Sequence, residues 1–161
     1  MVSRVAVKDA VRQVLSEKKK QPSYPITFEI YSDKTGKPHL KGNATEQIQI
    51  SLAHKGKDAV AIARHDKPVG IDMEIIAERS PEFYQLVFTD TELALLEERD
   101  QAEWTTRFWV AKEAYGKLLG TGLKGNPKRH EVTCIQGDHL WIDQIEIKTI
   151  KHLNYIIGWT L

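Results

Sequence analysis

The spacing of apolar residues along the chain predicts both helices and strands. Residues 4–18 form a predicted helix because apolar side chains recur there every three or four positions. These side chains belong to Val7, Val11, Val14 and Leu15. Pro22 and Pro25 follow, and since neither continues a helix, the helix is expected to end before them.

Alternation and short apolar runs predict strands in two groups. The first group covers residues 26–32, 47–53, 58–65 and 69–76. A turn at 33–38 follows the first strand, where Gly36 is free to adopt a positive φ. The second group lies near 131–136, 139–148 and 152–160.

Helix-capping signals lie between the two groups of strands. Ser80 and Pro81 are typical of the first positions of a helix. Thr89 and Glu92 have the spacing of a capping box, which opens a second helix. A longer helix is predicted from about 103 to 119, ended by Gly120 or Gly122. Its expected buried stripe comprises Phe108, Ala111, Tyr115, Leu118 and Leu119.

An internal similarity relates the first helix to the long one. The segment VKDAVRQVL (7–15) aligns with AKEAYGKLL (111–119), and strands follow both. We therefore predict an α+β fold in which two similar halves pack as a pseudo-dimer within one chain. The halves are residues 1–68 and 81–161, joined by a connecting strand at 69–80.

Composition limits the classes of protein that fit. A chain of 161 residues with 41% hydrophobic residues can bury a core and is not typical of disorder. No apolar run approaches the roughly 20 residues of a membrane span. The single cysteine, Cys134, excludes an internal disulfide and a multi-cysteine zinc site. We expect a reducing, cytoplasmic setting.

The charges nearly balance overall but are unevenly distributed. The net charge of +1 argues against a dedicated nucleic-acid binder. Residues 1–67 hold 13 basic and 7 acidic side chains, a net of +6, whereas residues 68–113 hold 4 and 11, a net of −7. This pattern suits an anionic ligand that binds through a metal ion, although unevenly charged surface helices would give the same pattern.

Two acidic patterns carry candidate chemistry. On the strand PVGIDMEII, Asp72 and Glu74 face away from the apolar side chains, and paired carboxylates suit Mg²⁺. On the long helix, Glu113 and Lys117 are one turn apart, so Glu113 is a possible third ligand and Lys117 a possible phosphate contact. The alternatives are a solvated strand face and a surface ion pair.

Two basic segments lie upstream. TGKP (35–38) places Lys37 on a tight turn, and SLAHKG (51–56) places His54 and Lys55 at the end of a strand. Each segment taken alone is more typical of a surface turn than of a binding site.

Together these motifs resemble a known family. VGIDME (69–74) and FWVAKEAYGKLLGTGL (108–123) resemble the signature pair of the 4′-phosphopantetheinyl transferases. TGKP and SLAHKG are similar to the two upstream segments of that family that contact coenzyme A. The segment 4–15 is similar to the first-half helix of the larger, pseudo-dimeric members that activate polyketide and peptide synthetases.

The resemblance implies an activity and a metal site. Members transfer the phosphopantetheine arm of coenzyme A to a serine of an apo acyl or peptidyl carrier protein, in fatty acid or polyketide biosynthesis. Asp72, Glu74 and Glu113 resemble the Mg²⁺ ligands. Glu113 also matches the residue proposed to take the serine proton, and Lys117 matches the lysine on the phosphates, so Asp72, Glu113 and Lys117 are the candidate catalytic residues.

Other basic positions match contacts to coenzyme A. Lys8, Lys37, Pro38 and His54 match positions that hold the nucleotide end, including its 3′-phosphate. Lys112 matches a basic position beside the metal-binding glutamate. One position departs from the family pattern: Ala53 stands where a serine usually precedes the histidine, so one phosphate contact is expected to be missing.

The expected partners are coenzyme A and an apo carrier protein, with no nucleic acid and no membrane. We expect a monomer, and because the chain starts almost at the first helix it resembles a domain at the C-terminal end of a large polyketide synthase. The segment SPEFYQLVF (80–88) is the candidate carrier-docking element. A metal-dependent phosphodiesterase or nucleotide hydrolase, and a degenerate docking domain without activity, remain as alternatives.

Overall fold

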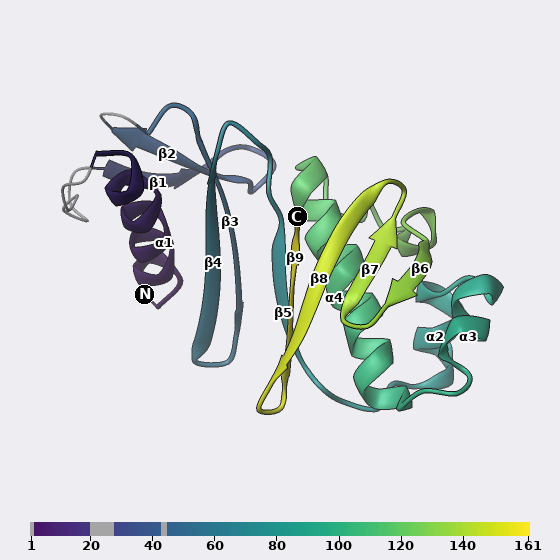
Figure 1. Cartoon of the computed structure of the whole chain (residues 1–161). Coiled ribbons are helices and arrows are strands. Elements are labelled where there is room, and N and C mark those ends of the chain that lie inside the picture. Colours follow the sequence, from purple (N-terminus) through teal and green to yellow (C-terminus); the bar gives the residue numbers. More distant parts are fainter. Residues whose placement is uncertain (1, 20–27, 43–44) are drawn as a thin grey trace.

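The computed structural model describes residues 2–19, 28–42 and 45–161 and has two parts lying side by side (Figure 1). One part has a helix against narrow strand pairs, and the other has a long helix against a broad sheet. The predicted α+β class is confirmed. Pro22 and Pro25 lie outside the described residues. Within the described ranges, no helix has the length and apolar character needed to cross a membrane.

The N-terminal part is built from one helix and two hairpins. The helix packs against the second hairpin and buries Val7 and Val11 completely. The first hairpin contains a strand that the sequence did not predict, because only a turn was expected after Ser32. The elements of this part are α1 (Val2–Lys19), β1 (Phe28–Ser32), β2 (Pro38–Gly42), β3 (Ile48–Lys55) and β4 (Asp58–His65).

The C-terminal part is an antiparallel sheet of strand order β5-β9-β8-β7-β6, with a long helix against one face. The single strand predicted at 139–148 is wrong: it contains a turn at Asp143, whose φ of 52° reverses the chain. The elements are β5 (Ile71–Ile75), α2 (Pro81–Val87), α3 (Asp90–Leu96), α4 (Gln101–Leu119), the 3₁₀ turn η2 (Pro127–Arg129), β6 (Val132–Gln136), β7 (His139–Ile142), β8 (Ile145–His152) and β9 (Tyr155–Thr160).

The predicted helix ends are confirmed. Ser80 caps α2, and its side chain accepts a hydrogen bond from the Phe83 amide. Thr89 and Glu92 form both hydrogen bonds of the capping box that opens α3. Gly120 ends α4 in the left-handed conformation, with a φ of 71°.

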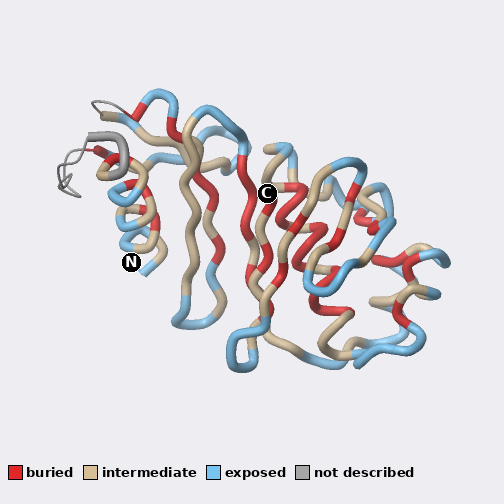
Figure 2. Tube along the Cα trace, in the orientation of Figure 1, coloured by how far each residue is buried: buried red, intermediate tan, exposed pale blue. Residues whose placement is uncertain are grey.

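Helix α4 is the centre of the larger core, and buried positions follow its length in Figure 2. Phe108 and Ala111 are fully buried, and Tyr115 is nearly so. Leu119, which was expected to belong to this stripe, is 47% exposed, so the buried face ends before the last helical residue.

The two helices related by the internal similarity, α1 and α4, are not buried at all of the same matched positions. Val7 and its counterpart Ala111 are both buried, but Leu15 is buried whereas Leu119 is exposed. Strand β5, expected to be a connector, hydrogen-bonds along its length with β9 and so is an edge of the larger sheet. The division at 1–68, 69–80 and 81–161 stays a prediction.

A close approach between β5 and α4 depends on Gly70. A Cβ atom at this position would lie 1.9 Å from the carbonyl oxygen of Ala114 and 2.8 Å from the amide nitrogen of Leu118. Thr160 holds Gly70 from the other side, through hydrogen bonds of 3.0 and 3.1 Å. Only glycine lets the backbone just before β5 lie this close to the helix.

A buried ion pair fixes the opposite side of α4. The amine of Lys112 lies 2.7 Å from Glu92, and both side chains are fully buried. It also donates to the carbonyl of Pro127, while Glu92 accepts from the amide of Val132. Burial lowers the pKa of Lys112, and Glu92 opposes that shift. The pair therefore links α3, α4, η2 and β6.

We predict that Gly70→Ala lowers the free energy of unfolding by at least about 2 kcal/mol, because the new methyl group meets backbone that cannot rotate away. Gly137→Ala is the control, since a Cβ atom there would meet no atom within 4 Å and only its positive φ of 57° would cost energy, about 1 kcal/mol. Urea unfolding followed by circular dichroism measures both. Equal losses in the two variants would contradict the steric role of Gly70.

We predict that Lys112→Met destabilises the protein by about 3 kcal/mol, because it leaves the Glu92 carboxylate buried without its cation. The exposed Lys128→Met removes the same charge nearby and is expected to change stability by less than about 0.5 kcal/mol. The same urea measurement compares them. A Lys112→Met variant as stable as Lys128→Met would mean that the ion pair has no net effect.

Candidate functional site

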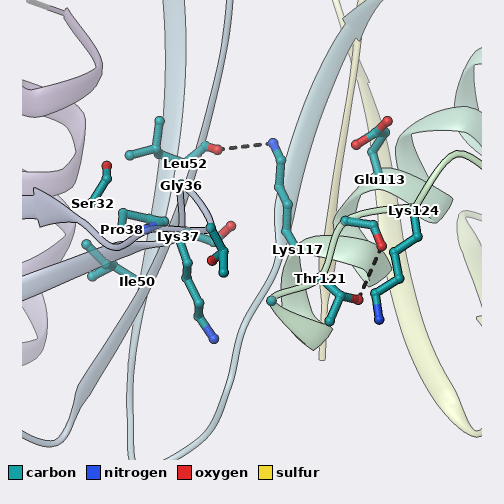
Figure 3. Close-up of a pocket in the computed structure, with 14 residues that line it drawn as sticks. Ser32, Gly36, Lys37, Pro38, Ile50, Leu52, Glu113, Lys117, Thr121 and Lys124 are labelled. Atoms are coloured by element: carbon teal, nitrogen blue, oxygen red, sulfur yellow. Dashed lines mark hydrogen bonds between the residues drawn. The ribbon is translucent and has the colours of Figure 1, made fainter.

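A cavity of about 560 Å³ lies where the two parts of the molecule meet (Figure 3). The turn between β1 and β2 supplies Lys37 and Pro38, and α4 supplies Glu113 and Lys117. Strand β3 and the loop that follows α4 complete the walls. Four of the residues selected from the sequence are thus gathered around one space, although they are up to 80 positions apart.

The turn that carries Lys37 is organised by Asp33. One oxygen of its carboxylate accepts hydrogen bonds from the amides of Thr35 and Lys37, at 2.8 and 3.1 Å. The other oxygen lies 2.8 Å from His39. Hydrogen bonds from Thr35 and His39 hold the pKa of Asp33 well below its usual range. The Lys37 side chain lies against Gly120, at the C-terminal end of α4.

Lys117 connects the two parts of the molecule. Its amine donates to the carbonyl of Leu52 on β3 at 3.1 Å (Figure 3). It also donates to the carbonyl of Ile71 on β5 at 3.1 Å. It also donates to Asp72 at 2.8 Å. An ammonium group has three protons, so these three acceptors use all of its donors.

Glu113 lies one helical turn before Lys117 and lines the cavity. In the part of the chain that the structure describes, its carboxylate forms no hydrogen bond or ion pair. Burial raises its pKa, and the nearby charges of Asp72 and Glu74 raise it further, against the effect of Lys117. Burial also raises the pKa of Asp72. Glu113 is therefore a carboxylate with a strengthened tendency to hold a proton.

Glu74 has a cationic partner of its own. The amine of Lys55, at the end of β3, lies 2.7 Å from one carboxylate oxygen of Glu74 and 3.0 Å from the other. The sequence marked Lys55 as part of a basic segment but did not predict this ion pair. Two of the three candidate metal ligands thus have a lysine as neighbour.

The donor chemistry of this site fits Mg²⁺. Asp72, Glu74 and Glu113 offer only carboxylate oxygens, and their mutual effects on pKa place them within each other's electric field. Over residues 2–19, 28–42 and 45–161, no group of three His, Cys, Asp or Glu side chains is already arranged as a metal site. The three carboxylates must therefore move closer together before they can share one cation.

Three candidate ligand-binding residues do not line the cavity. Lys8 is on α1, which packs on the hairpin of the N-terminal part, and His54 is exposed near the end of β3. Lys112 is in the buried pair with Glu92, so its expected contact with a ligand is replaced by a role in the core. Ala53 is buried, and the nearby Ser51 accepts a hydrogen bond from the Ile71 amide.

Other lining residues were not selected from the sequence. Lys124 extends from the loop after α4, on the opposite side of the cavity from Lys37 (Figure 3). Its φ of 48° and the glycines around it mark a tightly folded loop. The sequence signal was the run GTGLKG (120–125), which carries a cation among turn residues.

Comparisons with known proteins identify the family to which this chain is similar. Residues 68–158 match the family model of the 4′-phosphopantetheinyl transferase superfamily. The chain is 28% identical to the 4′-phosphopantetheinyl transferase gsp of Aneurinibacillus migulanus, over 92% of this chain and 61% of that protein. It is 34% identical to the L-aminoadipate-semialdehyde dehydrogenase-phosphopantetheinyl transferase of Eremothecium gossypii, over 58% of this chain and 37% of that protein.

The chain spans less than two thirds of the length of these two relatives. Among solved structures, it is 22% identical to the holo-acyl-carrier-protein synthase of Thermotoga maritima, with a TM-score of 0.49 over 58% of this chain and 61% of that one. The family match covers more than half of the chain and includes the paired acidic residues of β5 and the Glu113 and Lys117 positions of α4. The chain therefore belongs to the 4′-phosphopantetheinyl transferase superfamily.

Proposed function

We propose that this chain transfers the 4′-phosphopantetheine arm of coenzyme A to a serine hydroxyl of an apo acyl or peptidyl carrier protein. The observation that carries the proposal is the cavity between the two parts, where three lysines lie together with one carboxylate that has no ion-pair partner among the described residues. These lysines are Lys37, Lys117 and Lys124. The cations suit a pyrophosphate and the carboxylate suits a proton acceptor.

The proposed reaction is a displacement at phosphorus. The serine oxygen attacks the β-phosphorus of coenzyme A, and the bond from that phosphorus to the bridging oxygen breaks. Adenosine 3′,5′-bisphosphate leaves with the bond's electron pair. Glu113 accepts the serine proton, a role that suits a partly buried carboxylate in the cavity wall.

The lysines bind and orient the substrate in this proposal. Lys37 stabilises the nucleotide end of coenzyme A, since the turn around Asp33 fixes its backbone at the cavity wall. Lys117 orients Asp72 and lies close enough to the cavity to offset charge on the leaving phosphate. His54 and Lys8 remain proposed contacts for the 3′-phosphate, and both lie on the N-terminal part.

We assign Mg²⁺ to Asp72, Glu74 and Glu113, where it supplies positive charge for the oxygens of the pyrophosphate. These residues are the carboxylates that approach one another at the junction of β5 and α4. Gly70 allows that approach, because it brings the start of β5 against the helix.

We propose carrier docking at the segment 80–88, which follows β5 in the chain and packs near η2 on the far side of the C-terminal part (Figure 1). Val87 and Phe88 belong to the core, and Phe83 packs against Trp109 at 5.5 Å between ring centres. Leu86 is 66% exposed, so it is the member of the segment that offers apolar surface to a partner. We further propose a cytoplasmic monomer that binds one coenzyme A per chain.

The central experiment is intact-mass analysis of an apo carrier protein incubated with this chain, coenzyme A and Mg²⁺. We predict a mass gain of one phosphopantetheine, and a loss of at least about a hundredfold in rate for Glu113→Gln, the scale typical of removing a general base. Glu98→Gln, an exposed position before α4, is the matched control and should keep the full rate.

The outcomes separate the alternatives. Full transfer by Glu113→Gln at saturating Mg²⁺ would rule out its assigned role. Breakdown of coenzyme A without carrier protein would instead indicate a phosphodiesterase. Binding of carrier protein with no mass gain by the wild type would indicate a docking domain.

We predict that Lys37→Ala raises the KM for coenzyme A about tenfold or more with a smaller change in kcat. The reason is that the Lys37 side chain is proposed to contact the nucleotide end of the substrate, which does not react. The substitution should also narrow the preference for coenzyme A over dephospho-coenzyme A. Lys34→Ala, which removes an exposed lysine from the same turn, is the control. An unchanged preference in Lys37→Ala would place the 3′-phosphate elsewhere.

A further inference from the structure

The ion pair between Lys55 and Glu74 has no role in the reaction described above. Lys55 Nζ lies within 3.0 Å of both carboxylate oxygens, and the Glu74 side chain is only 15% exposed. One of those oxygens also accepts a hydrogen bond of 2.9 Å from the amide of Ile75. The carboxylate that is proposed to meet a metal ion is therefore already occupied on both of its oxygens.

The neighbouring pair of Lys117 and Asp72 is held differently. Lys117 also donates to two backbone carbonyls, which fix its amine in place whatever Asp72 does. Lys55 is 43% exposed, and Glu74 is the hydrogen-bond acceptor found for it among the described residues. The Lys55 amine can thus move into solvent when another cation binds the Glu74 carboxylate.

We propose that Lys55 competes with the divalent cation for Glu74 and thereby sets the metal affinity of the site. This inference rests on the metal assignment of the proposed function. A cation that uses Glu74 must first displace the ammonium group, so the apparent affinity equals the intrinsic affinity multiplied by the fraction of time that the ion pair is open. Metal binding then releases the positive charge of Lys55 at the end of β3, a strand that lines the cavity.

The test measures metal binding directly, without substrate or turnover. Mn²⁺ is the probe, the full chain is used, and free Mn²⁺ is followed by electron paramagnetic resonance. We expect Lys55→Gln to bind Mn²⁺ about tenfold more tightly than the wild type, because Glu74 is then open and one repelling charge is gone.

Lys57→Gln is the matched control. Lys57 is exposed in the turn after β3, so the change removes the same charge two residues away without freeing Glu74. We expect its affinity to stay within about twofold of the wild type, since exposed charges are screened by salt. An equal gain in Mn²⁺ affinity in Lys55→Gln and Lys57→Gln would overturn the proposal, because the change in net charge alone would then explain the gain.

A second pair of variants tests the role of Glu74. In the wild-type background, Glu74→Gln is expected to weaken Mn²⁺ binding by less than about threefold; in the Lys55→Gln background it should abolish the tenfold gain. A gain that survives Glu74→Gln would also overturn the proposal.

The Asp72→Asn variant tests the metal site itself, independently of the competition by Lys55. Weaker Mn²⁺ binding by Asp72→Asn, together with equal affinities of Lys55→Gln and Lys57→Gln, would overturn only the competition. No Mn²⁺ binding by the wild type or Lys55→Gln would overturn both the competition and the metal site.

Discussion

The position of one ammonium group determines how the two parts of this protein meet. Lys117 extends from α4 and donates its three protons to a carbonyl of β3, a carbonyl of β5 and the carboxylate of Asp72. An ammonium group with three fixed acceptors has a defined location, because loss of any one contact leaves a donor unpaired. The cavity, the approach of Asp72 to Glu113 and the wall that carries Lys37 all follow from that junction.

Glycine makes this junction possible. The amine of Lys117 can reach β5 only because Gly70 lets the backbone before that strand touch α4. A second close contact shapes the same C-terminal end of the helix, where the Gly122 amide donates to the carbonyl of Gly116 at 3.1 Å and the following loop folds back. The glycines of both signature segments thus have a steric function, and the charged residues beside them depend on it.

Adjacent residues of the α4 signature have opposite fates. Lys112 lies in the core, where its ion pair with Glu92 ties α4 to α3 and β6. Glu113, the next residue, faces the cavity and has no ion-pair partner among the described residues. Successive helical positions are about 100° apart, so one motif serves both stability and chemistry. Two lysines from different elements neutralise the carboxylates of β5: Lys55 of β3 pairs with Glu74, and Lys117 of α4 pairs with Asp72.

Local sequence patterns determined the caps of α2 and α3, the end of α4 and the strand that carries Asp72, because these features depend on hydrogen bonds and burial within a few residues. The turn at Asp143 escaped prediction because its positive φ involves no glycine, and β2 escaped because Pro38 and Gly42 weaken the strand signal. The sequence also identified four residues of the cavity wall. Which lysines reach the carboxylates was decided only by tertiary structure, since Lys55 meets Glu74 across 19 positions and Lys117 meets Asp72 across 45. Such pairings depend on how strands and helices pack in space, and no local periodicity encodes that packing.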